Sequence, residues 1–219
     1  MNLSESLPVL DAVEQRVLGA LMEKSKTTPE YYPMTINALI AACNQKTSRK
    51  PVVQYDEETV ALALNSLKKK GLISTATGGS SRAVKYKHNF AIVYPVAPAE
   101  VAIICLLLLR GPLTPGELNT NSGRLYEFES IEEVQQNLEK LAEANPPFVM
   151  QLQKRPGQKE VRFIHLLGEV SDLTEEENSP TETSSKGDIA ALESRLTQVE
   201  TELAEMKEAF NKLMKELMG

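Results

Sequence analysis

The sequence predicts a mostly helical α+β fold, with two tandem winged-helix (helix-turn-helix) domains and a C-terminal coiled-coil helix. An order of three helices and a β-hairpin recurs along the chain, which is the order of a winged helix. The two copies share residues at matching positions, and an apolar heptad pattern occupies the end of the chain. The predicted boundaries are 1–95 and 96–167 for the domains, 168–187 for an acidic flexible linker and 188–219 for the coiled-coil helix.

In the first domain, the cap residues mark where each helix starts. Asp11 is followed by Glu14 at the spacing of a capping box, so a helix is expected from residue 12. Thr35 caps a second, shorter helix, and Asp56 starts a third that Gly71 ends. Two β-like runs follow, at 72–77 and 83–88, and the Gly-Gly-Ser-Ser turn at 78–81 joins them into a hairpin.

The second domain repeats this order. An apolar helix over Pro98–Arg110 ends at Gly111, and Thr114 caps a short helix with proline at its first position. A third helix is expected over Ser130–Ala144. Two strands, at 148–153 and 160–166, flank a turn at 155–158.

Matching residues support an internal duplication. The core stripe of the first domain's third helix, with spacings of 4 and 3, recurs in the second domain; the two stripes are Val60, Leu64, Leu67 and Val134, Leu138, Leu141. The strand sequence VKYKH at 84–88 likewise recurs as VRFIH at 161–165. We therefore predict two copies of one folding unit.

Beyond residue 168 the character of the sequence changes. The segment 168–187 is rich in Glu, Ser and Thr and lacks periodicity, which is typical of a flexible linker. Apolar residues then alternate at spacings of 3 and 4 without a break, which predicts a coiled coil that joins copies of the chain. This predicted seam consists of Ile189, Leu192, Leu196, Val199, Leu203, Met206, Phe210, Leu213 and Leu217. An amphipathic helix that folds back on the domains is the alternative.

Composition limits the class of protein. No apolar run reaches the roughly 18 residues that a membrane span needs, and the N-terminus lacks the basic region of a secretory signal. The two cysteines have no metal-type spacing and suit reduced, buried thiols, so a cytoplasmic location is expected. The net charge of −6 divides into +4 for residues 1–95, −2 for 96–167 and −8 for 168–219. The first domain is therefore where an acidic partner is expected.

The pattern of an active site is missing from the sequence. The only histidines, His88 and His165, lie at equivalent strand positions, which favours a role in the fold, such as a strand-end hydrogen bond. No nucleotide-binding glycine motif or metal-ligand spacing is found, and the acidic pairs begin predicted helices, where they oppose the helix dipole. We expect a non-enzymatic protein with no catalytic residue, metal or cofactor. An enzyme would have to use residues such as Arg124 and Tyr126.

Cations of the first domain are the candidate phosphate contacts. In a winged helix the third helix usually enters the major groove, and the wing and the preceding loop contact phosphates. The cations lie in that loop, at the end of the third helix and on the wing with its second strand. This candidate set is Lys46, Arg49, Lys50, Lys68, Lys69, Lys70, Arg82, Lys85 and Lys87. A basic face that only contacts solvent is the alternative.

Acidic residues weaken the DNA hypothesis. Asp56, Glu57 and Glu58 occupy the start of the first domain's third helix, where carboxylates repel phosphates. The third helix of the second domain carries four glutamates against Lys140, which favours a protein-binding surface. Two hypotheses therefore stay open. One is a DNA-associated regulatory protein, dimeric through 188–219; the other is an adaptor that binds protein partners and no DNA.

Two long segments resemble a known family. The run TTPEYYPMTINALIAACNQKTSRKPV at 27–52 and the run LLLRGPLTPGELNTNSGRLYEF at 107–128 are similar to segments of the YceH family of bacterial proteins. The acidic linker and terminal coiled-coil helix add to the resemblance, which covers nearly the whole chain. It implies a bacterial cytoplasmic protein with two winged-helix domains. It implies no activity and no site residues.

Overall fold

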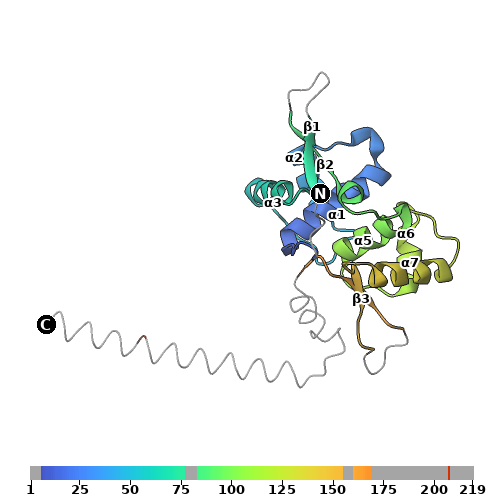
Figure 1. Ribbon diagram of the computed structural model, residues 1–219. Coiled ribbons are helices and arrows are strands. Elements are labelled where there is room, and N and C mark those ends of the chain that lie inside the picture. Colours follow the sequence, from blue (N-terminus) through green and yellow to red (C-terminus); the bar gives the residue numbers. More distant parts are fainter. Residues whose placement is uncertain (1–5, 77–82, 155–159, 169–206, 208–219) are drawn as a thin grey trace. The chain divides into compact units, whose positions relative to one another are not determined.

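The computed structural model describes residues 6–76, 83–154, 160–168 and 207 (Figure 1). One compact unit covers Met1–Leu173 and another covers Thr174–Gly219, and every element below belongs to the first. Arg82 at the predicted wing, the predicted linker beyond 168 and all nine positions of the predicted seam lie outside the described residues. No helix in the described part of the chain has the length and apolar character needed to cross a membrane.

The first half has the predicted helices and hairpin. Its elements are α1 (Ala12–Thr27), η1 (Pro29–Tyr31), α2 (Ile36–Cys43), α3 (Glu57–Lys69), β1 (Ile73–Ala76), β2 (Lys85–His88) and α4 (Phe90–Val93). Asp11, Thr35 and Asp56 cap α1, α2 and α3 as predicted, each through its side-chain oxygen. The short helix α4 was not predicted.

The second half repeats the order with α5 (Pro98–Arg110), α6 (Pro115–Ser122), α7 (Ile131–Glu143), β3 (Val149–Gln151) and β4 (Phe163–His165). Thr114 caps α6 as expected, and Ser130, predicted as the first residue of the third helix, caps α7. The strands are shorter than predicted. Leu72 lies outside β1 because its N–H donates to the carbonyl of Leu67 and closes the end of α3.

Both hairpins are two-stranded and antiparallel, and their registers correspond. Ile73 pairs with His88 in the first half, and Val149 pairs with His165 in the second. Each half also has a single β-bridge that sequence analysis missed, from the residue two before the second helix to the returning strand. These bridges are Met34 with Tyr86 and Leu113 with Phe163. The two halves therefore agree in the register of the hairpin and in the position of the β-bridge, as well as in the order of their elements.

The two halves share one hydrophobic core. The predicted stripes of α3 and α7 are buried, and their leucines and valines join a single apolar cluster that runs from Leu10 to Leu167. Helix α1 packs against α5 (Figure 1), and the Leu10 N–H donates to the Leu167 carbonyl at 2.8 Å. The shared core differs from the prediction of two successive domains at 1–95 and 96–167.

Gly19 lies where α1 meets α5. A Cβ at this position would come within 2.9 Å of Leu109 Cγ and 3.2 Å of Leu108 Cβ, and the Cys105 thiol donates to the Gly19 carbonyl at 3.4 Å. We expect Gly19→Ala to lower the free energy of unfolding by about 1–2 kcal/mol, because overpacking outweighs the gain in helix propensity. Urea unfolding measures this difference.

Gly123 is the matched control. It follows α6 with a φ of −51°, and an added Cβ there would meet nothing within 4 Å. Gly123→Ala should leave stability unchanged or raise it slightly. Equal destabilisation by both substitutions would contradict a close contact specific to α1 and α5.

Candidate nucleic-acid interface

Five of the predicted cations remain available at the surface of the first half. Lys50 in the loop before α3, Lys68 and Lys69 at the end of α3, and Lys87 on β2 are exposed, while Lys85 is half-buried. None of the five forms an ion pair within the described residues. These five are called the lysine set below.

The strand geometry places Lys85 and Lys87 on one face of the hairpin. Successive side chains of a strand alternate between faces, and the intervening Tyr86 packs against the core. Lys87 lies opposite Ser74 and Lys85 lies opposite Ala76, so neither faces an acidic residue across the hairpin. The outer face of this hairpin therefore carries positive charge that no neighbouring strand residue neutralises.

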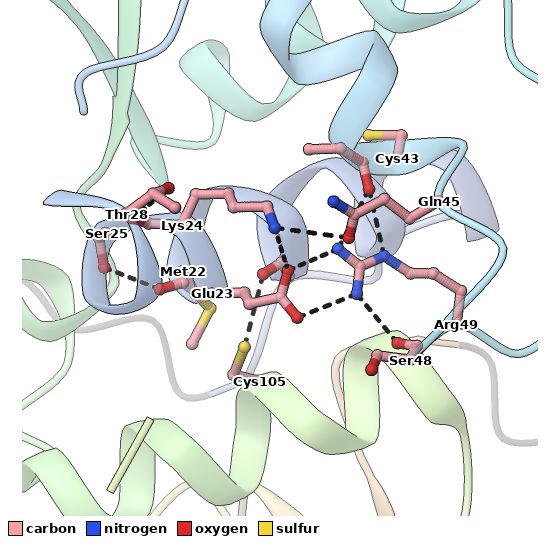
Figure 2. Close-up of polar contacts among 12 residues, drawn as sticks. Met22, Glu23, Lys24, Ser25, Thr28, Cys43, Gln45, Ser48, Arg49 and Cys105 are labelled. Carbon is pink, nitrogen blue, oxygen red and sulfur yellow. Dashed lines mark hydrogen bonds and ion pairs between the residues drawn. The ribbon is translucent and has the colours of Figure 1, made fainter. Parts of the chain in front are cut away.

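Arg49 does not belong to this surface, which corrects its prediction as a phosphate contact. Its side chain has 0% exposure and donates to the Glu23 carboxylate from both terminal nitrogens, at 2.6 and 3.1 Å (Figure 2). Burial by itself would raise the pKa of Glu23, but the hydrogen bonds and charge of Arg49 hold that pKa below its ordinary value. Arg49 therefore forms a buried ion pair with Glu23 of α1, and this pair is part of the fold.

A second buried arginine, Arg16, also donates hydrogen bonds to backbone carbonyls near the end of α2. Nε and Nη2 of Arg49 donate to the Ala42 carbonyl, and Arg16 donates to the carbonyls of Cys43 and Pro51 at 3.1 and 2.6 Å. The two guanidinium groups thus satisfy carbonyls at the C-terminal end of α2. Burial lowers the pKa of Arg16. Sequence analysis missed Arg16 because one arginine within a helical pattern looks like a surface residue.

Lys70 also differs from its prediction. Its ammonium group lies 2.6 Å from the Glu14 carboxylate and donates to the Val9 carbonyl, so it links the end of α3 to the start of α1. Glu14 is 2% exposed; burial would raise its pKa, yet hydrogen bonds from Lys70 and neighbouring groups lower it. The Lys70 ammonium group is therefore bound to Glu14 and Val9 within the fold and is not part of the exposed positive charge. Lys46 is exposed, but it lines a cleft between the two halves whose lining includes no member of the lysine set.

The outward face of α3 changes character along its length. Glu58, Leu62, Asn65 and Lys69 follow one another at helical spacing and are exposed, with Leu62 at 64%. Acidic groups occupy the first turn and lysines the last turn, as expected from the sequence. Favourable contact with phosphates is thus confined to the C-terminal end of α3.

The second half presents acidic residues at the corresponding helix. Glu132, Glu139 and Glu143 are exposed on α7, and Lys140 is its only cation. The Tyr126 hydroxyl donates to the Glu133 carboxylate at 3.1 Å, and this bond holds the segment before α7 against the helix. Within the described residues, no group of three His, Cys, Asp or Glu side chains is placed to hold a metal ion.

The two histidines occupy equivalent places at the ends of the hairpins. His88 Nε2 lies 3.2 Å from the Ser25 hydroxyl, whereas His165 is 1% exposed and its Nδ1 has no partner among the described residues. Burial lowers the pKa of each to about 4. Both imidazoles are therefore neutral at pH 7 and belong to the core of the hairpins.

In a comparison with known proteins, residues 10–158 match the family described as "Protein of unknown function, DUF480". A UPF0502 protein of Opitutus terrae is 51% identical over 177 residues, which cover 80% of this chain and 77% of that protein. A UPF0502 protein of Shewanella oneidensis is 45% identical over 215 residues, covering 93% and 97%, and one of Shewanella halifaxensis is 45% identical over 208 residues, covering 92% and 96%.

Proposed function

We propose that this chain, which belongs to the DUF480 family of proteins of unknown function, is a non-enzymatic, DNA-associated regulatory protein of the bacterial cytoplasm. Each half would act as a winged helix, and the resemblance to the YceH proteins is part of the same proposal. The first half would contact the phosphates of duplex DNA. The observation that carries the proposal is the lysine set, whose members have no acidic partner in the described part of the chain.

The expected binding mode follows from where these lysines lie. Lys68 and Lys69 end α3, Lys50 precedes it, and Lys85 and Lys87 follow on the hairpin, so loop, helix and wing each supply charge. Contacts of this kind fix the orientation of a protein on DNA without reading its sequence. The exposed face of α3 offers only Asn65 as an amide for base contacts, so weak sequence preference is expected. The predicted coiled coil would bring two such surfaces together.

Charge reversal at Lys69 tests the proposal. We expect Lys69→Glu to weaken binding to a short fluorescent duplex roughly tenfold at about 50 mM salt, because one phosphate contact is lost and a repulsive charge replaces it. Fluorescence anisotropy of the full chain measures the dissociation constant, and circular dichroism checks that the variant is folded.

Lys140→Glu provides the matched control. Lys140 is an exposed lysine in the last turn of α7, the counterpart of α3 in the second half. It should change the dissociation constant less than twofold. No binding of the unmodified protein at this salt concentration would overturn the proposal, and so would equal weakening by both variants.

An adaptor that binds a protein partner is the second candidate. Exposed Leu62 on α3 and Ile131 at the start of α7, at 64% and 43% exposure, favour it, together with the acidic residues of α7. The test is capture of a partner protein from extracts treated with nuclease. Capture by the unmodified chain and by Lys69→Glu, together with loss of capture by Leu62→Ser, would support this function over DNA binding.

A further inference from the structure

A cleft of about 330 Å³ lies between the two halves of the first unit. Its first-half wall comes from the end of α1 and the loop after α2, where Gln45, Thr47 and Ser48 expose polar groups. Its second-half wall comes from α5 and the end of α6, including Arg110, Asn121 and Arg124. Figure 2 shows the α1 side of this region, where Lys24, Gln45 and Ser48 surround the Glu23–Arg49 pair. The lysine set plays no part in this cleft.

Positive charge dominates the lining. Lys24, Lys46, Arg110 and Arg124 line the cleft, and among the described residues Glu23 is the only acidic one that lines it. The Glu23 carboxylate already accepts two hydrogen bonds from Arg49 and lies 3.2 Å from Lys24, so these two cations balance its negative charge. Lys46, Arg110 and Arg124 form no ion pair within the described residues. The cleft therefore has an excess of positive charge that attracts an anion.

Two buried polar atoms of cleft residues lack a hydrogen-bond partner in the described part of the chain. They are Thr27 Oγ1 and Arg110 Nε. Both atoms are covered by neighbouring protein atoms, so the polar groups open to the cleft are those of its exposed side chains, Lys46, Thr47, Ser48 and Arg124. Ser48 in the same wall has a positive φ of 61°, a conformation that a non-glycine residue adopts only when its surroundings impose it.

The remaining lining is apolar. Leu106, Leu109 and Leu125 contribute side chains to the cleft, beside the arginines. A volume of this size lies at the lower end of the range for small-molecule sites. A ligand with one anionic group and a compact, partly apolar body matches both surfaces.

We propose that this cleft binds a small phosphate ester. The guanidinium groups of Arg110 and Arg124 would bind the phosphate oxygens, because their paired N–H groups match that geometry. The exposed hydroxyl group of Ser48 would donate a further hydrogen bond, and the leucines would contact the body of the ligand. Since both halves contribute, the bound ligand stabilises the contact between α1 and α5.

Calorimetric titration of the full chain at about 50 mM salt tests this site with adenosine 5′-monophosphate, ribose 5-phosphate, inorganic phosphate and succinate, and with adenosine as the uncharged control. We expect binding of the phosphate esters, weaker binding of phosphate alone and none of adenosine. Arg124→Gln should weaken ester binding at least tenfold, because it removes a charged hydrogen-bond donor from an exposed position that does not support the fold. Arg110→Gln should have an effect of similar size.

Lys140→Gln, a loss of charge on α7 outside the cleft, should leave ester binding unchanged. Absence of ester binding at millimolar concentration would overturn the proposal, as would binding that neither arginine variant weakens. Equal binding of succinate and the esters would also contradict it, by assigning the cleft to carboxylates. A fourth contrary result is weakened DNA binding by Arg124→Gln without any ester binding, which would make the cleft part of the DNA surface.

Discussion

Replacing Arg49 with methionine is expected to lower the free energy of unfolding by about 3–5 kcal/mol, the range for removing one partner of a buried ion pair. The Arg49 side chain has 0% exposure, so its loss removes both of its hydrogen bonds to the Glu23 carboxylate, which keeps Lys24 at 3.2 Å. It also removes the Arg49 donors from the Ala42 carbonyl. Methionine has similar length and fills much of the space. Urea unfolding followed by circular dichroism measures the change.

Lys50→Met is the matched control, because Lys50 is the next residue and is exposed. Its effect on stability should stay within about 0.5 kcal/mol. A double-mutant cycle with Glu23→Gln should show that the effects of Glu23→Gln and Arg49→Met are strongly non-additive. If Arg49→Met is as mild as Lys50→Met and weakens DNA binding, Arg49 is a surface contact and the assignment made here is wrong.

Acid is expected to destabilise the protein through His165. Burial lowers the pKa of this residue to about 4, whereas an unfolded histidine titrates near 6.5, so the unfolded state binds more protons between these values. The contribution of the neutral ring is complete above pH 6.5 and is lost as the pH falls towards 4. From pH 7 to 4.5 the loss amounts to about 2–3 kcal/mol.

Urea unfolding at pH 7 and at pH 4.5 measures this loss, and His165→Leu provides the comparison. The variant lacks the titrating ring, so the difference in stability between the two pH values should shrink by about 2–3 kcal/mol. His88 stays in both proteins and contributes equally to each. A pH dependence that His165→Leu leaves unchanged would show that protonation of other groups destabilises the fold in acid.

Local signals predicted most of the elements correctly. Asp11, Thr35 and Asp56 are short polar residues placed directly before apolar periodicity, and each caps the helix expected to follow it. The stripes of α3 and α7 are buried because their spacing of 3 and 4 puts them on one helix face. Helix starts depend on neighbouring residues, so they are readable from the sequence, whereas strand lengths depend on pairing and were predicted too long.

The role of a charged residue depends on distant partners, so the cations were not assigned equally well. Arg49 and Lys50 are neighbours in one polar loop, yet one is buried against Glu23 and the other is exposed. Lys70 pairs with Glu14, which is 56 positions away. Nothing local distinguishes such residues from solvent-exposed cations, because the acidic partner comes from another element of the fold.

One signal of the shared core was present in the sequence. The segment 17–22 of α1 and the segment 101–109 of α5 are apolar or glycine all round, and a helix without a polar face has to be covered on every side. Two such helices within 219 residues indicate that they cover each other.

The salt dependence of DNA affinity measures most directly whether the lysine set contacts phosphates. If three or four of its members contact phosphates, the logarithm of the association constant should fall with the logarithm of salt concentration with a slope of about −3 to −4. A Lys68→Gln, Lys69→Gln double variant should reduce the steepness of this slope by about 2. A slope near zero, or one that the double variant leaves unchanged, would contradict the proposed function.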